Sequence, residues 1–447
     1  YDKCSKDDLI SRIIELEGSL KETRTKLKAA QGKSAFLIPP PKGDQKAFNF
    51  AAHPTRKIAL KFTYDGSFYN GLEFQRDPTP LPTVEEVLWG ALVHTRLVDP
   101  DVGMEGVGWE KCGRTDRGVS AAGQVVSFRI RSASDDNDEL KYVSTLNNIL
   151  PPTIRVLAWS PVSEDFSARY NCRYRHYKYF FLSRGLDIAA MRDGAERLVG
   201  EHDFRNLHKL DPAKQLTTFR RRILRADINA VDPAARDDVP QMYVLDLVGT
   251  AFLYNQVRHI MAILFLIGAG LEKSWIMTAL LNADPENPYP PYRPGEPVPP
   301  VVTTKPIYQM ADSLPLVLWD TGFSEGDVSW RTDYKGPEGP TKAAKPFAKN
   351  VCTQLRAAHE RTLIHAALHE HFFKAAAQYH DMPPDFFPIT PDSPPIPKGV
   401  VFGVPLGGAQ QKDTALYVPI LERQRLDPVE VSNERWRVGK GARRAAR

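Results

Sequence analysis

The sequence predicts an α+β fold with mainly antiparallel sheets. Short segments with apolar residues at every second position recur between residues 57 and 320, as in strands with one buried face. Segments with apolar residues every three or four positions lie between them, as in amphipathic helices. The chain has 447 residues, 42% of them hydrophobic and 25% charged, which is enough for two or three globular domains.

The first predicted unit begins with a strand at Lys57 and continues with a helix that Thr83 and Glu86 open as a capping box. A loop with several glycines and arginines, 111–122, then directly precedes another alternating strand. The order strand, helix, strand, helix, strand favours an α+β domain. The other predicted elements are strands at 124–130 and 154–159 and a helix at 142–150.

The second predicted unit has a similar element order and closes with a strand at 314–320. An insertion at 284–304 precedes that strand and contains too many prolines to form a strand or a helix. The other predicted elements are strands at 175–182, 221–231 and 242–249 and a helix at 256–271.

Both ends of the chain carry predicted extensions. Residues 1–31 are expected to form a helix, because Leu9, Ile13, Leu16, Leu20 and Leu27 follow the spacing of a coiled-coil seam. A lone helix of this length needs a partner, and both self-association and docking on the chain's own body remain open. The predicted domains are 1–31, a linker at 32–56, subdomains at 57–165 and 166–332, and an extension at 333–447 with a helix at 351–380, a proline-rich loop and a basic tail.

Composition and spacing argue against several other classes. The four cysteines are far apart, which excludes a CxxC zinc ribbon and suits a reducing compartment. The apolar stretch 260–271 is too short to cross a bilayer, and the first residues are charged, unlike a signal peptide. His365, His369 and His371 have no matching further ligand, so exposed histidines on a helix are expected and no metal site.

The loop KCGRTDRGVSAA at 111–122 carries the strongest candidate for chemistry. Arg114 and Arg117 would keep the Asp116 carboxylate ionised and would also attract phosphate. Gly113 and Gly118 would let the backbone bend sharply and would allow a close approach. On charge pattern alone, a turn aspartate that caps its own loop is the more common explanation.

The segment GRTDRGVSA resembles the signature (G/A)RTD(K/R)GV(H/S)A of the TruA family of tRNA pseudouridine synthases. FSARYNCRYRHYKYFF at 166–181 and AFLYNQVRHIMAIL at 251–264 resemble the family's other two motifs, in the same order. The resemblance implies that Asp116 is the nucleophile, Tyr177 the active-site tyrosine and Arg258 the arginine that pairs with the aspartate.

The resemblance also implies a fold and a reaction. The subdomains 57–165 and 166–332 would be two related halves of a catalytic core with a central active-site cleft. Asp116 would attack a uridine at C6 or C1′, and the base would be released, rotated and rejoined through C5 without metal or cofactor. A paired uridine must first be flipped out of its stem.

The implied substrate is tRNA. The arginines at 220–225 and the basic tail at 434–447 could follow its phosphate backbone. Arg114 is a candidate for filling the vacated stack or holding the flipped phosphate. An alternative for residues 202–204 is a helix start capped by Asp203. The expected substrate-binding residues are Arg114, Arg117, Lys111, His202, Asn206 and Lys209.

Segments outside the motifs, such as 201–211 and 305–320, resemble the eukaryotic branch that modifies uridines 38 and 39 of the tRNA anticodon arm. YNGLEFQ at 69–75 departs from the YQGF common in that branch, so no contact is carried over to this loop. Two alternatives remain: a sister synthase with other target positions, and a catalytically silent tRNA-binding or tRNA-folding protein. A homodimer without membrane association, in the nucleus, the cytoplasm or both, is expected.

Overall fold

The computed structural model describes residues 48–134, 139–234, 241–333, 351–381 and 401–445. The chain divides into two compact units, one made of residues 1–171 and 323–367 and the other of 172–322 and 368–447. The predicted heptad helix at 1–31, most of the linker at 32–56 and the whole second proline-rich loop at 382–397 lie outside the described residues. The sequence predicted the subdomains 57–165 and 166–332 from the similar order of their elements. The two compact units are defined by contacts between residues, which is a different criterion, so the subdomain bounds stay a prediction.

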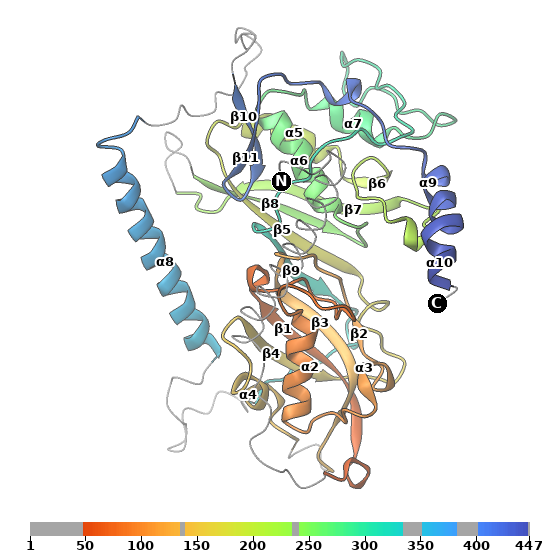
Figure 1. The fold of residues 1–447 in the computed structure, drawn as a ribbon, viewed down its shortest axis with the longest axis vertical. Coiled ribbons are helices and arrows are strands. Elements are labelled where there is room, and N and C mark those ends of the chain that lie inside the picture. Colours follow the sequence, from red (N-terminus) through yellow and green to blue (C-terminus); the bar gives the residue numbers. More distant parts are fainter. Residues whose placement is uncertain (1–47, 135–138, 235–240, 334–350, 382–400, 446–447) are drawn as a thin grey trace, which may run out of the picture. The chain divides into compact units, whose positions relative to one another are not determined.

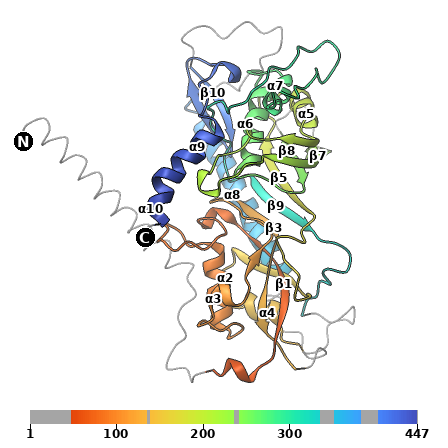
Figure 2. The ribbon, with the colours of Figure 1, turned by 90° about the vertical axis from the view of Figure 1, so that its right-hand side faces the viewer.

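The first unit contains an antiparallel sheet in the order β4-β1-β3, with β2 paired to β3. Ile58, Leu60 and Phe62 on β1 are fully buried, as their alternation predicted. Helix α2 covers one face of this sheet (Figure 2). The elements are β1 (Thr55–Tyr64), α2 (Val84–His94), α3 (Gly103–Gly106), β2 (Glu110–Lys111), β3 (Ser120–Arg131), α4 (Tyr142–Asn147) and β4 (Ile154–Pro161).

The capping box predicted for α2 is confirmed. The Glu86 backbone N–H donates to the Thr83 hydroxyl over 3.2 Å, and the Thr83 N–H donates to the Glu86 carboxylate over 3.4 Å. The helix thereby satisfies two of its free backbone donors locally, which is why its start could be predicted from four residues.

The second unit contains an antiparallel sheet in the order β9-β5-β8-β7-β6 (Figure 1). Tyr179 on β5 faces the core and packs edge-on against Phe265 of the buried helix α6. The elements are β5 (Tyr174–Leu182), α5 (Ile188–Glu196), β6 (Gly200–Asp203), β7 (Arg220–Ala230), β8 (Met242–Gly249), α6 (Gln256–Gly268), α7 (Trp275–Leu281) and β9 (Leu316–Gly322).

The insertion at 284–304 forms neither strand nor helix, as its prolines predicted. It is nevertheless fixed to α5 by charge. The buried Arg197 guanidinium pairs with Glu296, and Arg293 pairs with Asp193 over 2.6 Å and with Glu196 over 2.7 Å. The insertion is therefore an ordered part of the second unit.

The C-terminal part contains a hairpin that the sequence prediction missed. Strands β10 (Phe402–Gly407) and β11 (Gln410–Thr414) pair antiparallel. Their turn places Gly407, Gly408 and Ala409 in the left-handed region, with φ of 79°, 59° and 60°. A Cβ on Gly407 would lie 2.2 Å from the Tyr179 hydroxyl, so only glycine permits this approach.

Beyond the hairpin, α9 (Val429–Trp436) continues through a π-helical turn (Arg437–Gly441) into α10 (Ala442–Ala445). The predicted helix at 351–380 is observed as α8 (Val351–Ala376), and none of its residues is buried. Its histidines His365, His369 and His371 are exposed, as expected. None of the described helices is both long and apolar enough to cross a membrane.

Candidate active site

Asp116 lies in a tight turn between β2 and β3 of the first unit. The Val119 backbone N–H donates to the Asp116 carbonyl over 3.1 Å, and Gly118 turns the chain with φ +82°. Strand β3 begins at Ser120, so the predicted position of the loop directly before a strand is confirmed. Gly113, in contrast, does not adopt a positive φ.

Gly113 is instead held by the side chain of Gln124 from β3. The Gln124 amide donates to the Gly113 carbonyl over 2.8 Å and accepts from the Gly113 N–H over 3.3 Å. Gln124 is fully buried. A buried amide that satisfies both polar groups of one loop residue fixes that loop relative to the sheet.

A second segment packs directly against the Asp116 loop. The Leu72 N–H donates to the Thr115 carbonyl over 3.2 Å. Gly71 has φ +90°, and a Cβ there would lie 3.1 Å from the Thr115 carbonyl oxygen and 3.4 Å from the Asp116 carbonyl carbon. A Cβ on Gly66 would lie only 2.1 Å from the Val119 carbonyl oxygen. Gly66 is therefore required by the loop, and Gly71 is strongly favoured by its positive φ and its close approach. Neither was singled out in the sequence.

The residue before Asp116 is anchored in the core. The Thr115 hydroxyl is 2.6 Å from the Tyr64 hydroxyl, and both side chains are buried. Burial raises the pKa of Tyr64 well above its usual range, so Tyr64 remains a neutral phenol beside the loop. Asp116 itself is partly exposed, two residues after Arg114.

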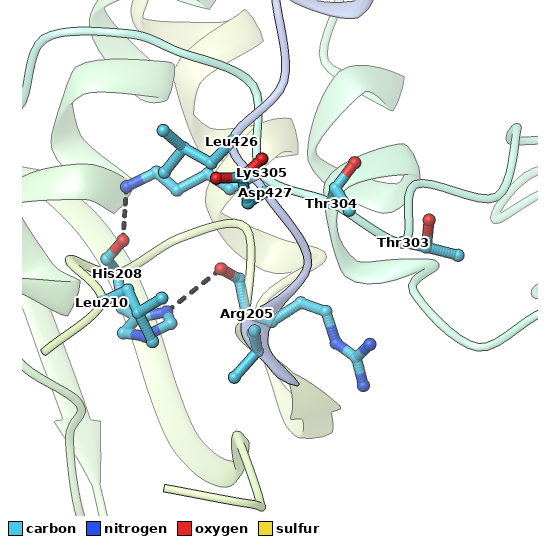
Figure 3. A pocket seen from close by; sticks show the side chains of 9 residues that line it. Arg205, His208, Leu210, Thr303, Thr304, Lys305, Leu426 and Asp427 are labelled. Carbon is cyan, nitrogen blue, oxygen red and sulfur yellow. Dashed lines mark hydrogen bonds between the residues drawn. The ribbon is translucent and has the colours of Figure 1, made fainter. Parts of the chain in front are cut away.

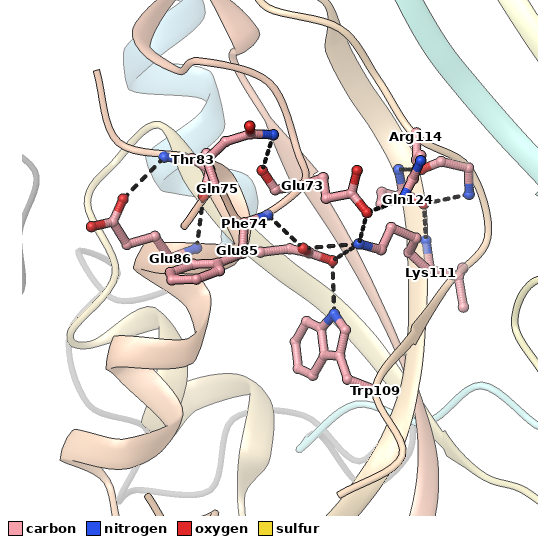
Figure 4. Close-up of polar contacts among 12 residues, drawn as sticks. Glu73, Phe74, Gln75, Thr83, Glu85, Glu86, Trp109, Lys111, Arg114 and Gln124 are labelled. Atoms are coloured by element: carbon pink, nitrogen blue, oxygen red, sulfur yellow. Dashed lines mark hydrogen bonds and ion pairs between the residues drawn. The ribbon is translucent and has the colours of Figure 1, made fainter. Parts of the chain in front are cut away.

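Two basic residues of this loop, Lys111 and Arg114, form a charge network with Glu73 and Glu85 (Figure 4). Glu85, 1% exposed, accepts from the Trp109 indole over 2.7 Å, from the Phe74 N–H over 2.8 Å and from the Lys111 ammonium. Lys111 also lies 3.1 Å from a Glu73 oxygen. Lys111 is thus committed to two carboxylates, and RNA would have to compete for it.

Arg114 also pairs with Glu73, but 56% of its side chain remains exposed. Arg117 is exposed as well. Exposed ion pairs contribute little stability, so a phosphate can replace Glu73 at the Arg114 guanidinium at small cost. The two arginines therefore remain available for RNA, unlike the enclosed Lys111. Glu73 and Glu85 had no assigned role in the sequence.

Tyr177 and Arg258 belong to the second unit. Tyr177 lies on β5, is 8% exposed and packs edge-on against Phe252 at 5.0 Å between ring centroids. Tyr179 on the same face is fully buried and donates to the Asp312 carbonyl over 3.0 Å, so it is a core tyrosine. A ring held on a buried strand keeps one orientation, as a stacking platform requires.

Arg258 lies in the first turn of α6 and is partly exposed. Its Nε donates to the Ala311 carbonyl over 2.8 Å, and the Ala311 N–H donates back to the Arg258 carbonyl over 3.1 Å. Asn255, the N-cap residue just before the helix, has the unusual φ of +57°. One edge of the guanidinium is therefore fixed by the backbone.

The expected RNA contact at Asn206 is wrong. Its side chain is fully buried and donates to the carbonyls of Leu280 and Val302 over 2.9 and 2.7 Å. A side chain closed off in this way joins backbone segments and is not accessible to RNA. The sequence could not distinguish Asn206 from His202 and Lys209 as an RNA contact, because the burial of each residue depends on elements far away in the chain.

The neighbours of Asn206 are placed differently from one another. The His202 ring is hydrogen bonded on both sides, to the Tyr289 hydroxyl and the Val199 carbonyl, each over 3.0 Å. Residues 200–203 form β6, so the alternative of a helix start is wrong, and Asp203 instead accepts from the Arg205 N–H over 2.9 Å. Lys209 is exposed, with its ammonium 5.7 Å from the Tyr254 ring centroid.

A buried group of bases lies behind this segment and was not foreseen. The Lys305 ammonium donates to the His208 carbonyl and lies 3.1 Å from His259 Nε2. Burial lowers the pKa of Lys305 to about 7. Burial and the charge of Lys305 together lower the pKa of His208 to about 4 and that of His259 to about 2. Figure 3 shows Lys305 and His208 beside Leu426 of the C-terminal segment.

The structure brings Lys111 and Arg114 together in the first unit with Asp116 on the same loop, and it places Tyr177 and Arg258 in the second unit. Among the described residues, no three His, Cys, Asp or Glu side chains gather as metal ligands would. The first unit offers a carboxylate close in sequence to two exposed arginines, and the second unit offers a packed tyrosine and an arginine. A carboxylate can act as a nucleophile, and exposed arginines attract a polyanion.

Comparison with known proteins agrees with this chemistry. A family model described as tRNA pseudouridine synthase matches residues 195–324. A "tRNA pseudouridine(38/39) synthase" of Saccharomyces cerevisiae is 34% identical over 98% of this chain and 91% of its own length. The Homo sapiens protein of the same name is 39% identical over 75% of this chain and 70% of its own length. A "tRNA pseudouridine synthase A" of Methanothrix thermoacetophila is 35% identical over 62% and 86%.

These matches define the chain first as a pseudouridine synthase. The chain belongs to the tRNA pseudouridine synthase family. Within that family, relatives that it matches over most of their length carry the name tRNA pseudouridine(38/39) synthase.

Proposed function

We propose that this protein isomerises uridine to pseudouridine at positions 38 and 39 in the anticodon arm of tRNA. The observation that carries the proposal is the match to the yeast tRNA pseudouridine(38/39) synthase over nearly the whole of both chains. The family membership supports the reaction, and the names of the matched relatives support the target positions.

In the proposed mechanism, Asp116 is the nucleophile. Its carboxylate forms a covalent bond with the uridine at C6 or at C1′, and the glycosidic C1′–N1 bond breaks. The base rotates and is rejoined to C1′ through C5. The proton on C5 is then lost, N1 takes up a proton in its place, and release of the carboxylate gives pseudouridine. The atoms of substrate and product are the same, so the reaction needs no redox cofactor.

Arg258 and Tyr177 assist Asp116 in this mechanism. Arg258 pairs with the carboxylate and keeps it ionised, and its backbone contact with Ala311 supports this role because it limits how far the guanidinium can move. Tyr177 stacks on the flipped base and assists removal of the C5 proton. Its packing on Phe252 supports a fixed ring position.

The loop cations hold the RNA while the base is out of its stack. Unstacking costs a few kcal/mol, so contacts on either side of the target must compensate. Arg114 and Arg117 are exposed and are proposed to bind the flanking phosphates, with Arg114 able to fill the vacated stack. Lys111 and His202 are proposed as secondary contacts, because both are already engaged by protein groups. Lys209, which is exposed, completes the set.

The test is to map pseudouridine in unmodified tRNA after incubation with the purified protein. We expect new pseudouridine at positions 38 and 39 and nowhere else in the anticodon arm. Pseudouridine at other positions alone would identify a sister synthase. Tight tRNA binding without any pseudouridine would identify a silent tRNA-binding or tRNA-folding protein.

We further propose that the protein acts as a homodimer. The heptad seam at 5–29 supports this proposal, because its leucines need a partner surface. Light scattering on the purified protein should give twice the chain mass of 50.2 kDa, and a single-chain mass would contradict it.

Localisation in the nucleus, the cytoplasm or both is likewise proposed, since arginine- and lysine-rich segments are compatible with nuclear entry. Imaging of a fluorescently tagged full chain in cells tests it, and retention in another compartment would contradict it.

A further inference from the structure

The C-terminal segment from Asp427 to Arg443, here called the C-terminal arm, is attached to the second unit at two places. Ahead of the arm, the Leu426 N–H donates to the Lys305 carbonyl over 2.8 Å, and Arg425 donates to the Thr304 carbonyl over 3.2 Å. Further along, α9 docks on the loop around Pro212–Lys214. The Gln215 amide donates to the Asn433 carbonyl over 3.1 Å, and the Asn433 amide donates to the Leu216 carbonyl over 3.2 Å.

The second half of the arm presents its positive charges on a folded backbone. The helix continues from α9 through the π-helical turn into α10 (Figure 2). Trp436 packs so closely on Gly441 that a Cβ there would lie 2.5 Å from the indole ring. The basic residues are therefore fixed relative to the docked α9. Ordering before binding lowers the entropy that an RNA contact must offset.

The charges of the arm are not all equivalent. Arg435 is paired with Asp427 over 2.8 Å, and Arg437 is paired with Glu434. Lys440 and Arg443 are exposed, and neither forms an ion pair with another residue in the described part of the chain. These two side chains, three positions apart, carry the uncompensated positive charge of the described arm.

The loop that receives α9 also carries cations beside an exposed aromatic ring. The ammonium groups of Lys209 and Lys214 lie 5.7 and 5.2 Å from the centroid of the Tyr254 ring, which is 38% exposed. The Lys209 N–H donates to the Tyr254 carbonyl over 2.9 Å. Tyr254 directly precedes Asn255, the N-cap residue of α6, and Arg258 follows within the first turn of the helix. The docking loop thus links the arm to the helix that carries Arg258.

We propose that the C-terminal arm, together with Lys209 and Lys214, is an RNA-binding surface that holds the tRNA sugar-phosphate backbone. Lys209 and Lys214 lie beside the exposed Tyr254 ring, and Lys440 and Arg443 lie on the helix that continues from the docked α9. Exposed cations on an ordered backbone, together with an exposed aromatic ring, can bind a nucleic-acid backbone without reading its sequence. The proposal rests on the proposed function for its RNA substrate. It adds Lys214 and the C-terminal arm to the residues that hold the tRNA.

The test measures tRNA binding of the full chain over a series of salt concentrations. The double variant Lys440→Gln/Arg443→Gln removes the two uncompensated charges. We expect weaker binding, and the slope of log K against log salt should fall in magnitude by about 1 for each lost phosphate contact. The matched control Lys273→Gln/Lys412→Gln removes two exposed lysines elsewhere in the second unit. It should keep the wild-type slope and activity.

A third variant separates a built surface from net charge. Asn433→Leu keeps every cation but removes the hydrogen bond to Leu216 and disfavours docking of α9. It should also weaken tRNA binding, with a melting temperature close to that of the wild type. An equal loss in the control pair and the arm pair, or no loss in the arm pair, overturns the proposal. If wild-type protein neither binds tRNA nor modifies it, the proposed function fails, which is a different result.

Discussion

At the residue scale, the Asp116 loop depends on buried polar groups that carry no obvious signature. Gln124 holds Gly113 by two hydrogen bonds, and the Tyr64 hydroxyl holds Thr115. Glu85 accepts from an indole, a backbone N–H and an ammonium while almost wholly buried. Such groups are stabilising only when every partner is present, because an unpaired buried charge is costly.

Glu85→Gln should therefore destabilise the first unit. Glutamine can still accept a hydrogen bond, but the Lys111 charge would retain only Glu73, which is partly exposed. Breaking a buried pair costs roughly 3–5 kcal/mol, and the remaining Glu73 contact should reduce this to about 2–3 kcal/mol. Urea unfolding measures the change. The double variant Glu85→Gln/Lys111→Met should recover part of the loss, and an additive loss would argue against a coupled pair.

At the element scale, the loop that presents Asp116 and the segment 66–72 are packed backbone to backbone. Gly71 meets the Thr115 and Asp116 carbonyls, and Gly66 meets that of Val119. The Gly66 contact leaves no space for a side chain, and a Cβ on Gly71 would fit only after its neighbours shifted by a few tenths of an ångström. Positioning of the carboxylate is therefore a property of two segments together, and a change in one should be felt in the other.

A matched pair of glycine variants tests this packing. Gly71 and Gly108 both have positive φ, +90° and +67°, but a Cβ on Gly108 would meet no heavy atom within 4 Å. Either change to Ala strains the backbone by about 1 kcal/mol. Gly71→Ala must also push the Asp116 loop aside by a few tenths of an ångström. A misplacement of about 1 Å costs around 100-fold in rate, so the smaller shift should cost roughly several-fold. Single-turnover pseudouridine formation should fall for Gly71→Ala and stay near wild type for Gly108→Ala.

Elements with local signals could be predicted from sequence, and those set by distant contacts could not. Helix α2 carries its own capping box, and β1 alternates between its two faces, so both lie where they were expected. The hairpin β10–β11 was missed, although its Gly407–Gly408 turn follows an alternating stretch. Asn206 looked like a surface group, but its burial depends on carbonyls more than 70 positions away.

At the scale of the whole molecule, the candidate catalytic residues are divided between the two compact units. Asp116 comes from one unit, and Tyr177 and Arg258 come from the other. The catalytic roles of these residues were predicted from three motifs that occur in the same order as in the family. The charge pattern around each residue alone could not have predicted these roles. The stability of the whole second unit should depend on pH, because Lys305, His208 and His259 are buried and their pKa values are lowered in the folded state.

Stability should rise with pH because this group favours its neutral forms. The folded-state pKa of Lys305, about 7, is below its usual 10.5, so from pH 7 upward the unfolded chain binds more protons and stability increases. The pKa values of His208 and His259, about 4 and 2, are below 6.5, so stability is lost as pH falls below 6.5. Thermal midpoints between pH 5 and 9 measure both changes. Lys305→Met should remove the rise in thermal midpoint between pH 7 and 9. If the midpoint of this variant still rises over that range as in the wild type, Lys305 is not the cause of the rise.

The central claim is that Asp116 is the nucleophile, and the most direct test is single-turnover pseudouridine formation by Asp116→Ala at saturating tRNA. The affinity for the same tRNA is measured in parallel. We predict no detectable pseudouridine at positions 38 and 39, because no other group replaces the attacking carboxylate. We predict near wild-type tRNA affinity, because the arginines and the C-terminal arm are intact. Isomerisation by Asp116→Ala at the wild-type rate would show that another residue attacks the uridine.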